Sequence, residues 1–341
     1  MDQQAKLAPQ MKHYEEFASG EMRWLPYLMF FSRAGYQSPV LTTDSGGFRP
    51  TEVGNQRYSL LQDRPSGEVS VMLGASPAFG WGAVGDANTI PSLLAREPGS
   101  PPWLNLSASA FNSTQELLVF MLHRHQLPRI RDIVVLAGLN NLVVAGLPEA
   151  GSDYGQFFFS GEFFTQLGNP DLKKYYQQPK WAVGRLARRL TGAEPGPDRT
   201  LSPLARSELA AEIQARDLDR LLELAAPTGA KVHFMLQPTA TWTKKTLSPE
   251  EKLLIDEVNI ERSALWTMFT PILGDDVYRD YRDRLAAVCA RRGISFLDAS
   301  ALLGGDEWLF IDQAHITDAG NKRLAAAISG MLTPGGARGE S

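Results

Sequence analysis

The chain has 341 residues, more than a typical single domain but compatible with one α/β domain that carries insertions. Its net charge of −4 and sequence pI of about 5.8 argue against a nucleic-acid partner, because proteins of that class concentrate positive charge. Hydrophobic residues make up 43% of the chain, which is enough to bury a substantial core.

The number of cysteines and the first residues of the chain indicate the cellular compartment in which we expect the protein. Cys289 is the single cysteine, so the chain has neither an internal disulfide nor a Cys-x-x-Cys metal site. The first residues lack a basic segment followed by an apolar stretch, and the early apolar cluster Leu25–Phe31 is too short to cross a bilayer. We therefore expect a cytoplasmic protein with no membrane span.

Short apolar runs alternate with helical segments, the pattern of a parallel sheet covered by helices. The runs are mostly hydrophobic rather than alternating, as expected for strands buried on both faces. Five strands are predicted: Val69–Leu73, Trp103–Leu106, Ile133–Ala137, Lys231–Leu236 and Ile294–Leu297. The predicted helices are one opened by a capping box at Ser113-Thr-Gln-Glu116, then Ser207–Ala225, Asp276–Arg292 and Thr317–Leu332.

Three stretches interrupt this alternation. Residues 1–65 form an N-terminal extension that we expect to pack on a main domain of residues 66–335, and residues 336–341 are predicted to be a flexible tail. Residues 146–205 form an insertion rich in aromatic residues, and residues 238–275 a second one, opened by the capping box Ser248-Pro-Glu-Glu251. Insertions after the strands of an open α/β sheet lie over its ligand-binding edge, so both are predicted to act as lids.

The aromatic residues of the first insertion suggest a largely apolar pocket that is partly covered. They are Phe157, Phe158, Phe159, Phe163, Phe164, Tyr175, Tyr176 and Trp181.

The first strand leads directly into Gly74-Ala-Ser76-Pro-Ala-Phe-Gly80. Glycines on both sides of a serine let the chain turn sharply and leave the hydroxyl exposed at the carboxyl end of the strand. A serine needs a positioned base to act as a nucleophile. An ordinary strand-to-helix turn with a serine cap would show the same residues, so this motif alone does not decide between the two.

A candidate base lies near the C-terminus, in Asp312-Gln-Ala-His315. A histidine three residues after an aspartate can turn back so that the carboxylate fixes its tautomer, and its other ring nitrogen then faces the serine. The alternative is a histidine close to a helix start that Thr317 caps.

Two further motifs follow predicted strands. Asn140, after the third strand, is positioned to donate its side-chain N–H to an oxyanion, although an Asx-turn asparagine is also common in loops. After the second strand, in Asn105-Leu-Ser107-Ala-Ser-Ala110-Phe111, a backbone N–H could serve the same purpose. All four motifs fall where an open α/β sheet builds its site.

This order of motifs resembles the SGNH (GDSL-like) hydrolase superfamily. That family has Gly-Asp-Ser after the first strand, a glycine block after the second, Gly-x-Asn-Asp after the third and Asp-x-x-His near the end. Over about residues 69–332, with the insertions excluded, the matching residues are Ser76, Gly138, Asn140, Asp312 and His315.

The resemblance implies a flavodoxin-like three-layer α/β sandwich with a five-stranded parallel sheet. It also implies roles for individual residues: Ser76 is the nucleophile, His315 the base, Asp312 its orienting carboxylate and Asn140 an oxyanion donor.

The chain departs from the family pattern at three places. Ala75 and Asn141 replace the aspartates of the first and third blocks, and Ala110, or alternatively Ser107, stands at the glycine of the second block. An alanine still offers a backbone N–H, so Ala110 is the second expected oxyanion donor. These departures indicate a divergent branch with an N-terminal extension and two insertions.

The sequence thus predicts an enzyme that cleaves or transfers an acyl group of an ester or thioester through an acyl-Ser76 intermediate. It would need no metal and no organic cofactor. Its partner would be a small-molecule or acyl-carrying substrate, and the oligomeric state is left open. Two alternatives stand beside it: a biosynthetic acyltransferase or cyclising enzyme with the same triad, and a catalytically weakened SGNH-like binding protein.

Overall fold

The computed structural model describes residues 3–19, 23–160, 163, 201–261 and 268–333. At its centre lies a five-stranded parallel sheet with the strand order β6-β5-β7-β8-β9. The strands are β5 (Val69–Gly74), β6 (Trp103–Asn105), β7 (Ile130–Ala137), β8 (Lys231–Leu236) and β9 (Ser295–Asp298). Counted from the first strand of this sheet, the order is 2-1-3-4-5, that of flavodoxin-like folds. The predicted fold class is confirmed.

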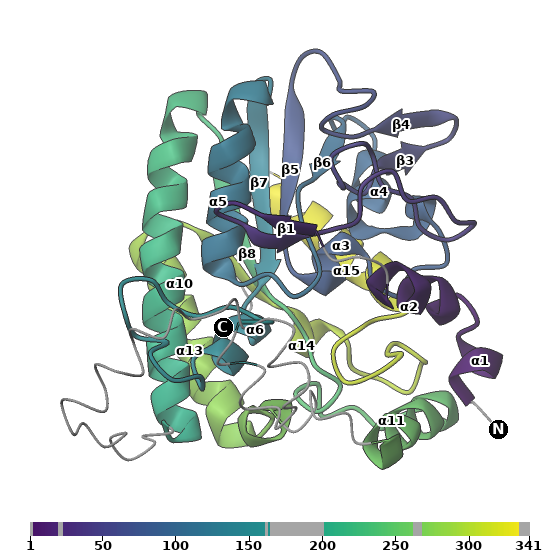
Figure 1. Ribbon diagram of the computed structural model, residues 1–341, viewed down its shortest axis with the longest axis vertical. Coiled ribbons are helices and arrows are strands. Elements are labelled where there is room, and N and C mark those ends of the chain that lie inside the picture. Colours follow the sequence, from purple (N-terminus) through teal and green to yellow (C-terminus); the bar gives the residue numbers. More distant parts are fainter. Residues whose placement is uncertain (1–2, 20–22, 161–162, 164–200, 262–267, 334–341) are drawn as a thin grey trace, which may run out of the picture.

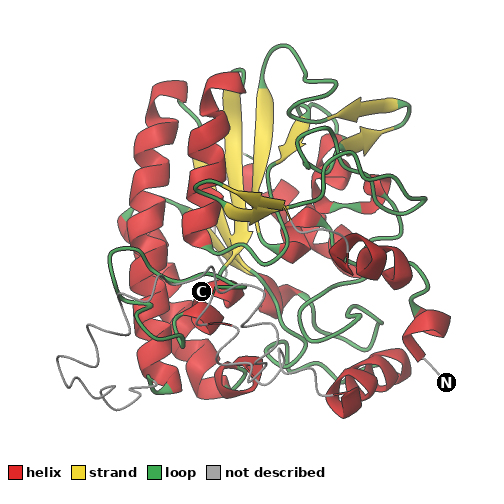
Figure 2. Cartoon of the chain, viewed as in Figure 1, coloured by secondary structure: helices red, strands yellow, loops and turns green. Residues whose placement is uncertain are grey.

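Helices cover both faces of the sheet and complete three layers (Figures 1 and 2). Successive strand residues point to opposite faces, so Val71 and Leu73 join one core cluster and Met72 joins the other. The first cluster is covered by α5 (Ser113–His123), α10 (Pro203–Ala225) and α13 (Asp275–Arg291). The second is covered by α3 (Ser76–Phe79), α4 (Ile90–Ala95), α14 (Ala299–Leu302) and α15 (Asp318–Leu332).

The start of α5 differs from the prediction. Asn112 is the N-cap: its side chain accepts a hydrogen bond from the Gln115 N–H at 3.1 Å, and the Gln115 side chain accepts one from the Asn112 N–H at 3.3 Å. The predicted box at Ser113 and Glu116 is therefore wrong by one residue. The Ser113 hydroxyl instead donates to Asp217 on α10 at 2.6 Å, which satisfies it without a cap.

Of three other helix starts, two agree with the prediction and one lies upstream of it. Ser248 and Glu251 exchange the two hydrogen bonds of a capping box, at 2.7 and 3.3 Å, and α11 (Pro249–Glu261) follows. Thr317 caps α15, whereas α10 begins at Pro203, upstream of the predicted start at Ser207, with Ser202 as its cap.

The N-terminal residues add two helices and two small antiparallel hairpins beside the main sheet. These elements are α1 (Gln3–Leu7), α2 (Met11–Ser19), β1 (Arg23–Leu25) paired with β2 (Met29–Phe31), and β3 (Thr51–Val53) paired with β4 (Gln56–Tyr58). β3 contacts α4 and β6, which places the second hairpin against an edge of the sheet (Figure 1). The division into an extension, a main domain and insertions stays a prediction.

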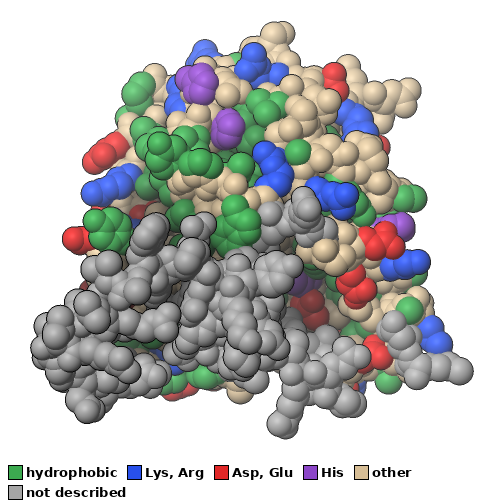
Figure 3. Space-filling model, viewed as in Figure 1, with side chains coloured by type: hydrophobic (Ala, Val, Ile, Leu, Met, Phe, Trp, Pro, Cys, Tyr) green, Lys and Arg blue, Asp and Glu red, His purple; other side chains and the backbone are tan. Residues whose placement is uncertain are grey.

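Several sequence-based expectations fall outside the described residues. Phe164, Tyr175, Tyr176, Trp181 and the tail 336–341 belong to this group. Among the described residues, no helix is long and apolar enough to cross a membrane. On the face shown in Figure 3, Lys and Arg side chains are scattered among hydrophobic and other side chains.

Candidate active site

A sharp turn at the end of β5 presents Ser76. Gly74 has φ of +146°, and a Cβ added there would lie 2.1 Å from the carbonyl oxygen of Leu136 on the neighbouring strand, so only glycine fits. The chain then enters α3, in which Ser76 is the first residue and Pro77 the second. The half-buried Ser76 side chain thus stands at the carboxyl edge of the sheet, where β5 and β7 lie side by side and the strand order reverses.

Three side chains meet here in one line of hydrogen bonds. The Nε2 atom of His315 lies 2.8 Å from the Oγ atom of Ser76, and its Nδ1 atom lies 2.7 Å from Oδ2 of Asp312. Because a carboxylate only accepts hydrogen bonds, the imidazole proton belongs on Nδ1, which leaves Nε2 free to accept the Ser76 proton. The geometry is that of a serine, a general base and a carboxylate that orients the base.

Asp312 is held as an anion although its side chain is buried. Burial acts to raise its pKa, but the attraction of His315, the hydrogen bond from that ring and the N–H groups of Ala314 and His315 outweigh it, so the pKa is lowered. Both N–H groups donate to Oδ1 at 2.8 Å. A charged Asp312 can stabilise the imidazolium that forms when His315 takes a proton.

The loop that carries Asp312 and His315 is braced by the second insertion. Oε1 of buried Glu251 accepts the N–H groups of Leu309 and Phe310 at 2.9 and 3.0 Å, and Lys245 neutralises the carboxylate at 2.6 Å. Downstream, the N–H of Ala240 donates to the carbonyl of Gln313 at 2.9 Å. Within the segment 238–275, predicted as a lid, Ala240, Lys245 and Glu251 therefore support this loop.

Three residues expected to supply oxyanion donors line one cavity, beginning with Ser76. Its own N–H is at the first position of α3 and has no acceptor within the helix. Ala110 lines the same cavity with φ of +63°, a left-handed conformation that favours glycine, as its place at the family's glycine suggests. Asn140, in α6 (Leu139–Val144), also lines the cavity.

The Asn140 amide has a defined orientation. Its Nδ2 atom lies 2.7 Å from the carbonyl oxygen of Phe111, and a carbonyl requires a donor at that position. Among the described residues, the second hydrogen of Nδ2 has no acceptor. Ser107, the alternative to Ala110, is fully buried, and its N–H donates to the Asn105 side chain at 3.0 Å, so it is already satisfied.

Asn141, the neighbour of Asn140, faces the other way and is structural. Its Oδ1 accepts the N–H of Ser113 at 2.9 Å, and its Nδ2 donates to the Ser113 hydroxyl at 2.8 Å and to Gln214 at 3.3 Å. These bonds join α6 to α5 and α10. An asparagine supplies both the donor and the acceptor that this junction needs, whereas the aspartate of the family pattern would only accept.

A mostly apolar cavity of about 140 Å³ opens beside Ser76. Trp81 forms part of its wall and packs over the His315 ring, with the ring centroids 5.7 Å apart. No role was predicted for Trp81 from the sequence, although it follows the turn at Ser76 closely. The described lining is Ser76, Trp81, Ser109, Ala110, Leu139, Asn140, Phe158, Phe159, Gln237, Phe269, Ala314 and His315.

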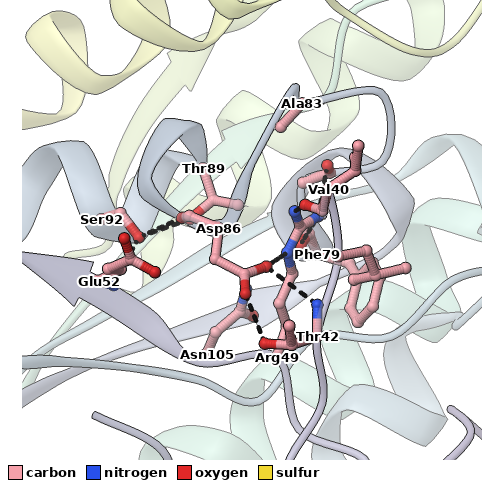
Figure 4. A network of polar contacts seen from close by, with 12 residues as sticks. Val40, Thr42, Arg49, Glu52, Phe79, Ala83, Asp86, Thr89, Ser92 and Asn105 are labelled. Carbon is pink, nitrogen blue, oxygen red and sulfur yellow. Dashed lines mark hydrogen bonds and ion pairs between the residues drawn. The ribbon is translucent and has the colours of Figure 1, made fainter. Parts of the chain in front are cut away.

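Buried Arg49, from the N-terminal residues, holds the C-terminal end of α3 (Figure 4). Its guanidinium donates to Asp86 at 2.8 Å, to the carbonyl of Gly80 at 2.7 Å and to the carbonyl of Val40 at 3.1 Å. The Tyr14 hydroxyl donates to the carbonyl of Ala83 at 2.7 Å and lies 3.0 Å from the same Gly80 carbonyl. The segment thus satisfies the backbone at the end of α3.

Comparison with family models finds no match, and no curated protein matches the chain. Among solved structures, a GDSL-like lipase from Bacteroides thetaiotaomicron is similar, with 14% identity, a TM-score of 0.42 and coverage of 78% of this chain and 87% of that one. The aryl esterase of M. smegmatis has 12% identity, a TM-score of 0.43 and coverage of 78% and 98%. An extracellular lipase from Streptomyces rimosus has 14% identity, a TM-score of 0.44 and coverage of 79% and 100%. At these values, function has to be argued from the site itself.

Proposed function

We propose that this chain is a serine-dependent enzyme that cleaves or transfers an acyl group of an ester or thioester. The observation that carries the proposal is the line from Asp312 through His315 to Ser76, with contacts of 2.7 and 2.8 Å at the carboxyl edge of the sheet. A serine with a base in hydrogen-bond reach, and a base held by a buried carboxylate, is the arrangement that nucleophilic catalysis requires.

In the proposed reaction, Ser76 Oγ attacks the carbonyl carbon while its proton passes to His315 Nε2. The negative charge on the former carbonyl oxygen is stabilised by the N–H groups of Ser76 and Ala110 and by Nδ2 of Asn140. Collapse of this intermediate breaks the bond to the leaving group, which takes the proton from His315. An acceptor then attacks the acyl-serine, again with His315 as the base.

The acceptor decides between the two forms of the activity. Water gives a hydrolase, and an alcohol or amine gives an acyltransferase or a cyclising enzyme. The intact hydrogen-bonded triad favours either form over a catalytically weakened binding protein, because a binding role places no demand on the Ser76–His315 contact. We expect neither a metal nor an organic cofactor and no nucleic-acid partner; with a single cysteine, the cytoplasm stays the expected compartment.

Turnover of p-nitrophenyl acetate and butyrate, and of an acetyl thioester, tests the proposal. Ser76→Ala should lower kcat/KM at least about a thousandfold, because the covalent route is lost. Ser19→Ala, at an exposed position on α2, is the matched control and should retain full activity. Equal turnover by wild type and Ser76→Ala would refute the proposal.

A further inference from the structure

Two polar atoms in the mostly apolar cavity beside Ser76 have no hydrogen-bond partner among the described residues. Within the described residues, neither the Ser109 hydroxyl nor Oε1 of Gln237 makes a hydrogen bond, and the Gln237 side chain is 1% exposed. Both residues line the cavity. Buried polar groups in proteins nearly always form hydrogen bonds. Two such groups without a hydrogen bond, in the lining of one cavity, therefore point to a bound molecule as their partner.

The position of Gln237 is set by its backbone. Its N–H donates to the carbonyl of Ala137 at 2.9 Å, which extends the β7–β8 pairing by one residue beyond Leu236. The bond from Ala240 to the carbonyl of Gln313 fixes the chain just downstream. Gln237 therefore follows a strand at the same edge as Ser76 and Asn140, and its amide is presented from a rigid element rather than from a loose loop.

The stereochemistry of acyl transfer tells which part of a substrate would meet Gln237. The oxyanion points to Asn140 and Ala110, and the leaving group must lie near Nε2 of His315 to receive its proton. The remaining substituent on the carbonyl carbon is the acyl chain, which is directed into the rest of the cavity. The lining of the cavity includes the apolar side chains Phe158, Phe159, Phe269 and Leu139, and Gln237 and Ser109 contribute the two unpaired polar groups.

We infer that the enzyme prefers short acyl groups that carry a hydroxyl, recognised by Gln237 and Ser109. A volume of 140 Å³ holds roughly four or five non-hydrogen atoms, each counted as about one water volume. A hydroxyl suits the site because it both donates and accepts, so it can pair with either end of the glutamine amide and with the serine hydroxyl. The inference rests on the proposed function and adds the substrate class to it.

Isosteric ester pairs test the preference in the wild-type protein. In p-nitrophenyl lactate against isobutyrate, and 3-hydroxybutyrate against isovalerate, a hydroxyl replaces a methyl group of similar size. At least one hydroxylated member should have a kcat/KM about fivefold higher, the usual effect of one neutral hydrogen bond. Gln237→Met should reduce that ratio to about one, and Ser109→Ala should reduce it in part. Phe158→Leu, which reshapes the same cavity without removing a polar group, should leave the ratio unchanged.

Ratios near one for both pairs in the wild type, or a preference that survives in Gln237→Met, would overturn the inference. If either result is obtained while Ser76→Ala still abolishes turnover of the apolar esters, the proposed function stands and only the inferred acyl preference is wrong. If no ester is turned over and Ser76→Ala behaves as the wild type does, both fall together.

Discussion

Adjacent asparagines in α6 offer a test in which activity and stability should separate. Asn140→Ala removes one side-chain donor beside Ser76, and the loss of one oxyanion-hole donor typically costs about 2.7–4 kcal/mol of transition-state stabilisation. We therefore expect kcat to fall by roughly a hundred- to a thousandfold. The variant also loses the 2.7 Å bond to the Phe111 carbonyl, which should lower the free energy of unfolding by only about 1–2 kcal/mol.

Asn141→Ala should show the opposite result. Its amide makes three hydrogen bonds to Ser113 and Gln214 and is 1% exposed. Leaving those buried partners unsatisfied should cost about 2–4 kcal/mol of folding free energy. The folded fraction should keep kcat within a few-fold of the wild type, because Asn141 does not line the cavity.

The assay is hydrolysis of a p-nitrophenyl ester, with urea unfolding of each variant to correct for the folded fraction. Near-normal turnover in Asn140→Ala would remove that residue from the oxyanion site. Equal losses of activity in folded Asn140→Ala and Asn141→Ala would show that α6 acts as a unit and that the division of roles is wrong.

Two further predictions concern buried charges. Arg49→Met removes the fully buried partner of Asp86 and the donor to the Gly80 and Val40 carbonyls, and it should lower the free energy of unfolding by about 3–5 kcal/mol. Arg57→Met, at a 41% exposed side chain that contacts the same carboxylate, should cost at most about 1 kcal/mol. Equal shifts in thermal melting would contradict the assignment. Burial, with a smaller contribution from Asp217, raises the pKa of Glu116 well above its usual value. The folded state then keeps a proton that the unfolded state loses, so stability should decline as pH rises above about 4.3. Glu116→Gln should remove that decline in urea unfolding between about pH 5 and 8, and an unchanged pH slope would contradict it.

The sheet could be predicted from the sequence because its strands are buried on both faces. The run Ile133–Ala137 is continuously apolar and Lys231–Leu236 is mostly so, and this signal does not depend on distant partners. Helix starts were harder to place. Ser113 and Glu116 have the residue types of a capping box, but Ser113 bonds to Asp217 on α10, a contact that the local sequence does not contain.

The site was partly predictable for a related reason. Side chains that follow strands of a parallel sheet gather at one edge, and this rule located Ser76 and Asn140. Applied to the fourth strand, the same rule would have located Gln237, which follows Leu236 directly. Nothing local marks Glu251 as the brace of the His315 loop, because its partners Leu309 and Phe310 are distant in sequence.

The most direct test of the central claim is labelling with a fluorophosphonate, which reacts with serines that a neighbouring base activates. We predict one labelled site, Ser76, identified by peptide mass spectrometry. Labelling should be absent in Ser76→Ala, fall sharply in His315→Ala and fall in Asp312→Asn, where the imidazole loses its orienting carboxylate. Folded wild-type protein that stays unlabelled, or labelling that persists in Ser76→Ala, would contradict the claim that Asp312, His315 and Ser76 form a working triad.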